Sequence, residues 1–270
     1  MRTIVHLSDL HFGRTDPEVL EPLRWRVHAL EPHLVVVSGD LTQRARSAQF
    51  REAKAFLDSL PRPQVVVPGN HDVPLYNVFQ RVLTPLRKYR RIISRELEPE
   101  FVDDEIAVVG VNTARSFVWK DGSIDSRQVE RVKDRIGGLD ERVIKIVVTH
   151  HPFDVPEDHD HSQIVDKAER AMLAFAQCGA DLLLSGHLHR SHTRPSAERY
   201  KAAGHSALIV QAGTATSTRG RGESNTFNCL RVSHEDVAIE RWQWNSATKV
   251  FELGPVERYL HAPDGWHRPR

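Results

Sequence analysis

The segment TIVHLSDLH, residues 3–11, joins a short β-branched run to an Asp and a His that could both bind a metal ion. Four similar runs follow, at residues 34–37, 64–67, 143–148 and 181–184. Each run ends in residues that can take part in chemistry. Such runs predict strands, and loops at strand ends are where α/β folds assemble their sites.

Helical spacing of apolar residues predicts covering helices between these strands, over 18–30, 47–60, 126–136 and 163–178. After Gly204 the pattern predicts strands without helices, at 207–212, 227–232, 237–244 and 249–253, and residues 101–113 predict a further strand pair. Two facing sheets with helices outside accommodate these elements. We therefore expect a single domain over 1–260 and a loose tail over 261–270, in which Trp266 could instead anchor on a neighbour.

Composition excludes several classes of protein. The chain has 270 residues, of which 40% are hydrophobic, so it can bury a substantial core and is not a disordered protein. Its 37 Lys and Arg nearly balance its 36 Asp and Glu, so no stable nucleic-acid complex is expected. Two isolated cysteines indicate no disulfide framework, and no export or membrane segment is visible. These features predict a cytoplasmic protein.

Five motifs stand at the ends of predicted strands: Asp9-Leu10-His11, Gly39-Asp40, Gly69-Asn70-His71-Asp72, His150-His151 and Gly186-His187-Leu188-His189. Their Asp and Asn oxygens and imidazole nitrogens suit Mn, Fe or Zn in the +2 or +3 state better than Mg or Ca. Seven of these side chains are candidate ligands, which is too many for one catalytic ion. Two ions about 3.5 to 4 Å apart could share a carboxylate and clamp a displacement at phosphorus. The motifs therefore predict phosphoester hydrolysis.

In order and spelling, the five motifs resemble those of the calcineurin-like metallophosphoesterase superfamily, over residues 3 to about 190. The resemblance implies an α/β fold, a four-layer α/β/β/α sandwich of two facing mixed sheets. It also implies one metal held by Asp9, His11 and His189, and a second held by Asn70, His150 and His187. Asp40 would bridge both ions, and a hydroxide between them would attack phosphorus. His71 resembles the family's non-ligand histidine, which donates a proton to the leaving oxygen or stabilises the phosphate.

Local spelling separates the branches of this superfamily. Where its protein phosphatases have an acid and a glycine, this chain has Gln43 and Ala45, although Arg44 remains as a candidate phosphate contact. Its lipid A precursor hydrolases usually carry Arg at the position of His71. Its nuclease subunits share all five motifs but normally need a longer chain and a basic DNA track. The motif spelling is most similar to that of bacterial class III cyclic nucleotide phosphodiesterases.

The resemblance thus implies a dinuclear phosphodiesterase, with a 3′,5′-cyclic nucleotide as the first substrate to test. The alternatives are a phosphodiesterase or phosphatase acting on another substrate, such as a lipid-linked phosphodiester, or a nuclease. A non-enzymatic binding scaffold is disfavoured, because none of the ligand residues is missing. The sequence leaves the metal pair and the oligomeric state open, including a homodimer.

Several residues outside this set have two interpretations. Asn112 and Arg115 follow a predicted strand and could contact substrate or form a turn, and Arg219 and Asn225 are similar candidates. The charged run 157–161 is expected to face water, with a gate over the site as the alternative. His151 should point away from the site of His150, because adjacent side chains on an extended chain alternate faces.

The segment 73–95 contains six basic residues and no acidic residue. Its apolar residues recur at helical spacing, so an amphipathic helix is predicted over much of it. The basic face could simply be solvated. It could also collect anionic substrate, or make a peripheral membrane contact.

Overall fold

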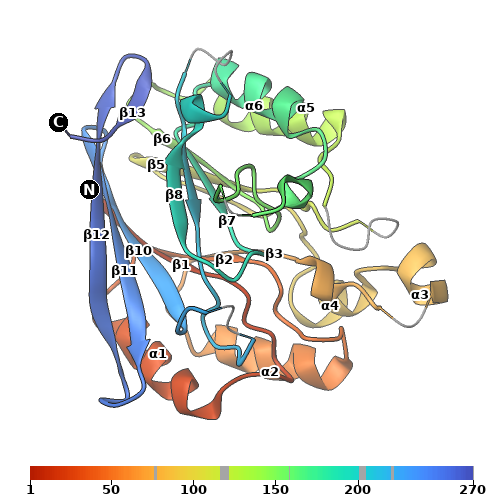
Figure 1. Cartoon of the computed structure of the whole chain (residues 1–270). Coiled ribbons are helices and arrows are strands. Elements are labelled where there is room, and N and C mark those ends of the chain that lie inside the picture. The colour runs from red at the N-terminus through yellow and green to blue at the C-terminus, as the bar shows by residue number, and fades with distance from the viewer. Residues whose placement is uncertain (76–77, 116–121, 158, 201–204, 220–221, 270) are drawn as a thin grey trace.

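The computed structural model describes residues 1–75, 78–115, 122–157, 159–200, 205–219 and 222–269. Two β-sheets face each other, and helices cover the outer face of each sheet (Figure 1). The first sheet has seven strands in the order β13-β12-β11-β10-β1-β2-β3, and the second has six in the order β4-β5-β6-β7-β9-β8. The predicted four-layer sandwich is confirmed.

The first sheet combines a parallel part and an antiparallel part. Strands β1, β2 and β3 run parallel, and β10 to β13 continue from β1 as antiparallel strands. Helices α1 and α2 lie along its outer face (Figure 1). The bounds of these elements are β1 Arg2–Leu7, α1 Pro17–Ala29, β2 Leu34–Ser38, α2 Ser47–Asp58, β3 Gln64–Val67, β10 Thr226–Val232, β11 Asp236–Asn245, β12 Val250–Ala262 and β13 Gly265–His267.

The second sheet is parallel from β5 to β9 and antiparallel at its two edges. Helices α5 and α6 cover its outer face (Figure 1). Its elements are β4 Glu100–Val102, β5 Ile106–Gly110, α5 Ser126–Ile136, β6 Ile144–Val148, α6 Ala168–Gln177, β7 Leu182–Ser185, β8 His192–Pro195 and β9 Leu208–Gln211. The predicted strand pair within 101–113 is therefore confirmed as β4 and β5.

Alternation along the strands builds the layers, because successive side chains of a strand point to opposite faces. In β1, Ile4 lies in the core between the sheets, whereas Val5 packs in the core under α1 and α2. In β6, Ile146 joins the inter-sheet core and Val147 joins the core under α5 and α6. Both faces of the central strands β1, β2, β6 and β7 are thus buried, which makes these strands rigid supports for the loops at their ends.

The basic segment differs from the prediction of one continuous helix. It forms two short helices, α3 (Val78–Leu83) and α4 (Arg87–Ile92). Pro85 lies between them and cannot donate the backbone hydrogen bond that a continuous helix needs. In α4 the buried Tyr89 anchors the helix, whereas Phe79 and Leu83 of α3 are 78% and 64% exposed. Helix α3 lies at the periphery of the molecule (Figure 1).

The C-terminal region is also more ordered than predicted. Residues 261–270 were expected to be loose, but β13 pairs with the end of β12 and Trp266 is fully buried. The Trp266 ring stacks on His261 with centroids 4.6 Å apart, so the alternative of an anchored tryptophan is correct. Strand β12 extends well past the predicted 249–253 because it pairs with β11 along most of its length. Conversely, the helix predicted from residue 163 begins only at Ala168.

No helix among the described residues is both long enough and apolar enough to cross a membrane.

Candidate metal centre

The five motifs lie at the carboxyl ends of five parallel strands. Asp9 and His11 follow β1, Asp40 follows β2, and Asn70 follows β3 in the first sheet. His150 follows β6, and His187 and His189 follow β7 in the second sheet. The loops of both sheets therefore meet at one edge of the sandwich, and the donor atoms separate into two sets.

The first donor set consists of Asp9, His11 and His189, all buried. The Nε2 atoms of His11 and His189 lie 3.4 and 3.3 Å from Asp9 Oδ1. These two nitrogens are 3.1 Å from each other. The three potential ligand atoms are therefore close enough together to bind a single ion.

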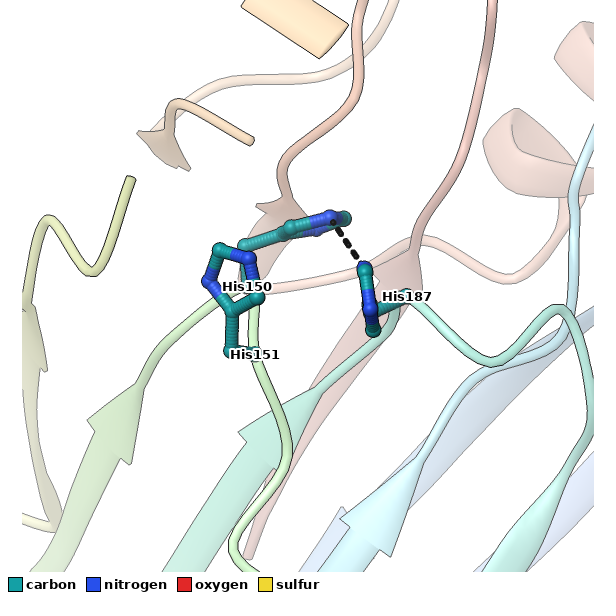
Figure 2. A group of neighbouring side chains, drawn as sticks. All are labelled: His150, His151 and His187. Carbon is teal, nitrogen blue, oxygen red and sulfur yellow. Dashed lines mark hydrogen bonds between the residues drawn. The ribbon is translucent and has the colours of Figure 1, made fainter. Parts of the chain in front are cut away.

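The second donor set consists of Asn70, His150 and His187. Asn70 Oδ1 lies 3.0 Å from His150 Nε2 and 3.2 Å from His187 Nδ1. The two ring nitrogens are 3.3 Å apart, and Figure 2 shows them pointing toward each other. This arrangement matches the second set that the sequence resemblance implies.

Asp40 is buried between the two sets. Its Oδ2 lies 3.6 Å from His11 Nε2 in the first set, and its Oδ1 lies 3.4 Å from His150 Nε2 in the second. One carboxylate therefore presents an oxygen to each set. This is the geometry that a bridging ligand requires.

The donor groups fit metal ions on chemical grounds. Asp9 Oδ1 is buried and accepts no hydrogen bond from any residue that the structure describes, which is costly unless a cation compensates it. Burial lowers the pKa of His187 to about 3 and that of His189 to about 4, which keeps both rings neutral as metal ligation requires.

His150 behaves differently from the other two histidines. Burial lowers its pKa, but the Asp40 carboxylate, together with Asp9 and the carbonyl of Ser38, outweighs burial and raises the pKa to about 9. In turn, although burial opposes it, His150 holds the pKa of Asp40 well below its ordinary value. A bound cation would take the place of the His150 proton beside Asp40.

The backbone around the site is strained. Asp9, His11, Asp40, His187 and His189 have φ values of 54°, 48°, 53°, 76° and 58°. Such left-handed conformations are rare for residues other than glycine and cost roughly 1–3 kcal/mol each. They turn the side chains sharply away from the strand direction, which is how short loops bring seven donors together.

Two glycines allow the loops to approach closely. A Cβ atom on Gly69 would lie 2.2 Å from Asp40 Oδ1, and one on Gly186 would lie 1.8 Å from Ser8 Oγ. Neither space can hold a methyl group without displacing a neighbouring motif. The glycines at these two positions therefore let the motif loops pack closely around one point.

The His71 ring is held by a backbone carbonyl and by Arg219. Its Nδ1 lies 3.0 Å from the carbonyl oxygen of Gln43, which can only accept, so Nδ1 carries the hydrogen. Its Nε2 lies 3.0 Å from Nη1 of Arg219, which can only donate, so Nε2 accepts. The His71 ring is 4.9 Å from the His11 ring, at the edge of the first donor set.

Asp72, which closes the third motif, has a role that the sequence did not indicate. It is buried, and its carboxylate accepts hydrogen bonds from the backbone nitrogens of Gly69, Leu41 and Thr42 at 2.9 to 3.1 Å. It therefore joins the loop that carries Asp40 to the loop that carries Asn70. Its position at the end of the third motif was the sequence feature that could have indicated this role.

His151 does not point away as expected. Its ring lies 4.9 Å from that of His150 and 4.8 Å from that of His187 (Figure 2), and Nδ1 lies 2.8 Å from Thr113 Oγ1. The two side chains do not alternate because the chain bends at both histidines instead of staying extended. His150, His151 and His187 together form a further group with metal-ligand spacing.

The remaining candidates are held mainly by local contacts. Asn112 Oδ1 accepts from the backbone of Ala114, which is the turn-forming alternative. Arg115 is tied to Asp125 by a 2.8 Å ion pair, and Asn225 Nδ2 donates to the carbonyl of Ser217 at 3.0 Å. Arg44 is half-buried beside Gln43.

The charged run 157–161 faces water in the part that the structure describes, and Asp158 lies outside that part. Glu157 is exposed and pairs with Arg194 at 3.1 Å, and Asp160 caps the short 3₁₀ helix His161–Gln163.

Comparisons with known proteins agree with this geometry. A model of the calcineurin-like phosphoesterase family matches residues 2–191. The 3′,5′-cyclic adenosine monophosphate phosphodiesterase CpdA of Escherichia coli K12 is 23% identical over 204 residues, which cover 69% of each chain. A dimetal phosphatase from Danio rerio superimposes with a TM-score of 0.64 at 14% identity, over 89% of this chain and 95% of that one. A purple acid phosphatase from yellow lupin superimposes with a TM-score of 0.72 at 12% identity. The superposition covers 95% of this chain and 53% of the phosphatase chain.

Gly186→Ala should destabilise the protein by about 3 kcal/mol, the upper range for overpacking, and reduce its bound metal. The added methyl would displace Ser8 and the Asp9 carboxylate, whose Oδ2 would lie 2.6 Å from the new Cβ. Gly138→Ala is the matched control, because a Cβ there meets nothing within 4 Å. Urea unfolding and elemental analysis of both variants measure the effect, and equal stability of the two would contradict the packing argument.

Proposed function

Because the chain belongs to the calcineurin-like phosphoesterase family, we propose that it is a dinuclear phosphodiesterase whose substrate is a 3′,5′-cyclic nucleotide. The coarser part of this statement, a metal-dependent phosphoester hydrolase, follows from the family and the structural neighbours. The position of Asp40 between two complete donor sets carries the proposal of a two-metal reaction.

The metal ions best suited to the site are Mn, Fe or Zn, because each set mixes imidazole nitrogens with amide or carboxylate oxygens. Asp9, His11 and His189 would hold one ion, Asn70, His150 and His187 the other, and Asp40 both. When bound, such a pair activates water as a nucleophile and stabilises charge on the phosphoryl oxygens.

His71 and Arg219 are the chain's own groups for handling the substrate. Arg219 donates to His71 Nε2 at 3.0 Å, and both side chains are half-buried beside the first donor set. A phosphodiester bound at the metals would bring its negative charge and its leaving oxygen to this pair. The pair could then stabilise that charge, and His71, once protonated, could donate to the leaving oxygen.

Support for a cyclic nucleotide comes from the similarity to the Escherichia coli cyclic AMP phosphodiesterase and from the motif spelling. The charge of the neighbouring surface is consistent with any anionic substrate. A cavity of about 670 Å³ is lined by Arg51, Arg87, Lys88 and Arg91, with no acidic residue among its described lining. Lys88 Nζ donates to the carbonyl of Ala45 at 2.9 Å, which ties this basic cavity to the loop that holds His71.

A second candidate substrate is a lipid-linked phosphodiester. The exposed Phe79 and Leu83 of α3 directly precede Gln80 and Thr84, which line this basic cavity. Such a combination suits a substrate with an acyl chain, or a peripheral contact with an anionic membrane.

The proposed substrate is tested by initial rates with Mn on cyclic nucleotides, glycerophosphodiesters, nucleotide sugars, an acylated phosphodiester and single-stranded DNA. We expect the highest kcat/KM on a 3′,5′-cyclic nucleotide. Preference for the acylated compound would support the second candidate, and hydrolysis confined to DNA would place the protein with the nucleases.

Asp40→Ala should abolish hydrolysis and lower the metal content from two ions to one or none, because it removes the only ligand assigned to both ions. Asp58→Ala, at an exposed ion-paired carboxylate on α2, is the control and should keep both ions. Elemental analysis after dialysis measures the difference. Two tightly bound ions and ordinary turnover in Asp40→Ala would refute the dinuclear assignment.

His71→Ala should retain both ions and lose about 10²- to 10⁴-fold in kcat, the usual contribution of a positioned acid. If His71 donates a proton, the loss is larger for an alkoxide leaving group than for p-nitrophenolate, and equal losses indicate charge stabilisation. The combined variant with Arg219→Ala should lose less than the product of the two single losses, because the residues act as a pair. Fully multiplicative losses would show that they act independently.

Arg87→Gln with Arg91→Gln should lower kcat/KM at low salt, leave kcat nearly unchanged, and lose its effect at high salt. The reason is that surface charges steer anions only over a Debye length of about 8 Å at physiological salt. The control variant is Arg142→Gln with Arg258→Gln, which removes two positive charges from exposed positions outside the basic segment. The same salt response in both double variants would show that only net charge matters.

A further inference from the structure

A second cluster of histidines and an aspartate lies at the other end of β7 from the metal centre. Asp181 directly precedes β7, whereas His187 and His189 follow it. His205 Nε2 and His261 Nε2 each lie 3.7 Å from Asp181 Oδ1. The three ligand atoms lie within 4.8 Å of one another, so the cluster has metal-ligand spacing of its own.

The cluster opens into a cavity of about 740 Å³, which would admit an ion and water. Asp181 is 4% exposed, and the side chains of His205 and His261 are about one-fifth exposed. The charged groups Lys145 and Glu141 also line this cavity. Their opposite charges would partly offset each other near a bound cation.

The hydrogen bonds of the cluster leave capacity for a ligand. His205 Nε2 is buried and has no hydrogen-bond partner among the described residues. Asp181 Oδ2 accepts from the backbone nitrogen of Lys145 at 2.8 Å. Its Oδ1 accepts from Trp266 Nε1 at 3.3 Å, which leaves a lone pair on the side of the two histidines.

We propose that Asp181, His205 and His261 bind a divalent transition-metal ion, with Zn²⁺ as the best fit, at a site separate from the catalytic centre. Two imidazole nitrogens and one carboxylate oxygen are a common ligand set for zinc, with water in the fourth position. In a tetrahedral site with bonds of about 2.0–2.1 Å, ligand atoms are about 3.3 Å apart. The observed separations of 3.7 Å need only small rotations to reach this value.

The surroundings favour a structural role. Asp181 directly precedes β7 of the second sheet and His261 lies in β12 of the first, so an ion here would cross-link the two sheets. His205 adjoins Ser206, which forms a bridge with Gly265 at the start of β13. Trp266 would orient the Asp181 ligand through its hydrogen bond, as outer partners of metal ligands commonly do. The site would thus fix the C-terminal strand that the sequence pattern did not reveal.

The test compares Zn²⁺ binding by the full-length wild type and by His205→Ala with His261→Ala. Each metal-free protein is titrated with Zn²⁺ against a chromophoric chelator, and bound metal is counted by elemental analysis. We expect one ion fewer in the double variant and a smaller rise in Tm on adding Zn²⁺. The control is His267→Ala, an exposed histidine on β13 that pairs with Asp264 and should keep the full count.

Two further measurements separate this site from the catalytic one. The double variant should keep phosphodiester hydrolysis with Mn, whereas Asp40→Ala should keep the zinc ion that the double variant lacks. If the double variant does not fold, His205→Gln with His261→Gln preserves bulk and should lose the same ion. An unchanged ion count and an unchanged Tm response in either folded variant would overturn the proposal.

Discussion

The Asp40 carboxylate is the contact through which the two halves of the metal centre meet. It faces His11 of the first sheet on one side and His150 of the second sheet on the other, and its Oδ1 also accepts from the backbone nitrogen of His71 at 2.8 Å. A buried charge of this kind is tolerated only with close partners of opposite charge. The loops of both sheets are consequently arranged around it.

This arrangement costs conformational energy, which the rest of the fold offsets. Several ligand residues adopt left-handed backbone conformations. The carboxylates of Asp9 and Asp40 are both buried, and both lie close to His11. Strain of this kind persists only where the surrounding structure is rigid. The fully buried inter-sheet core, which contains Ile4, Val36, Ile146 and Leu184, supplies that rigidity directly beneath the site.

The sequence predicted the two facing sheets because these depend on local signals, whereas the division of the ligands into two sets came from the resemblance to the family. Strands end where β-branched runs give way to Gly, Asp and His, and metal chemistry restricts which side chains can act as ligands. Features that depend on the backbone or on distant partners could not be predicted. The carbonyl that holds His71 belongs to Gln43, and any residue there would supply it. The bend at His151 and the buried position of Trp266 likewise follow from tertiary packing.

The pairing of β1 with β10 has a consequence for how the protein is made. Strand β1 carries Asp9 and His11 at its end, yet one of its two neighbours, β10, begins only at Thr226. During synthesis the first strand therefore stays exposed along one edge until most of the chain has left the ribosome. Pairings between segments so far apart in sequence form slowly, since a long loop must first be closed. The strand that carries two of the proposed metal ligands is therefore paired on both sides only late, and until β10 joins it the open edge can pair with other chains.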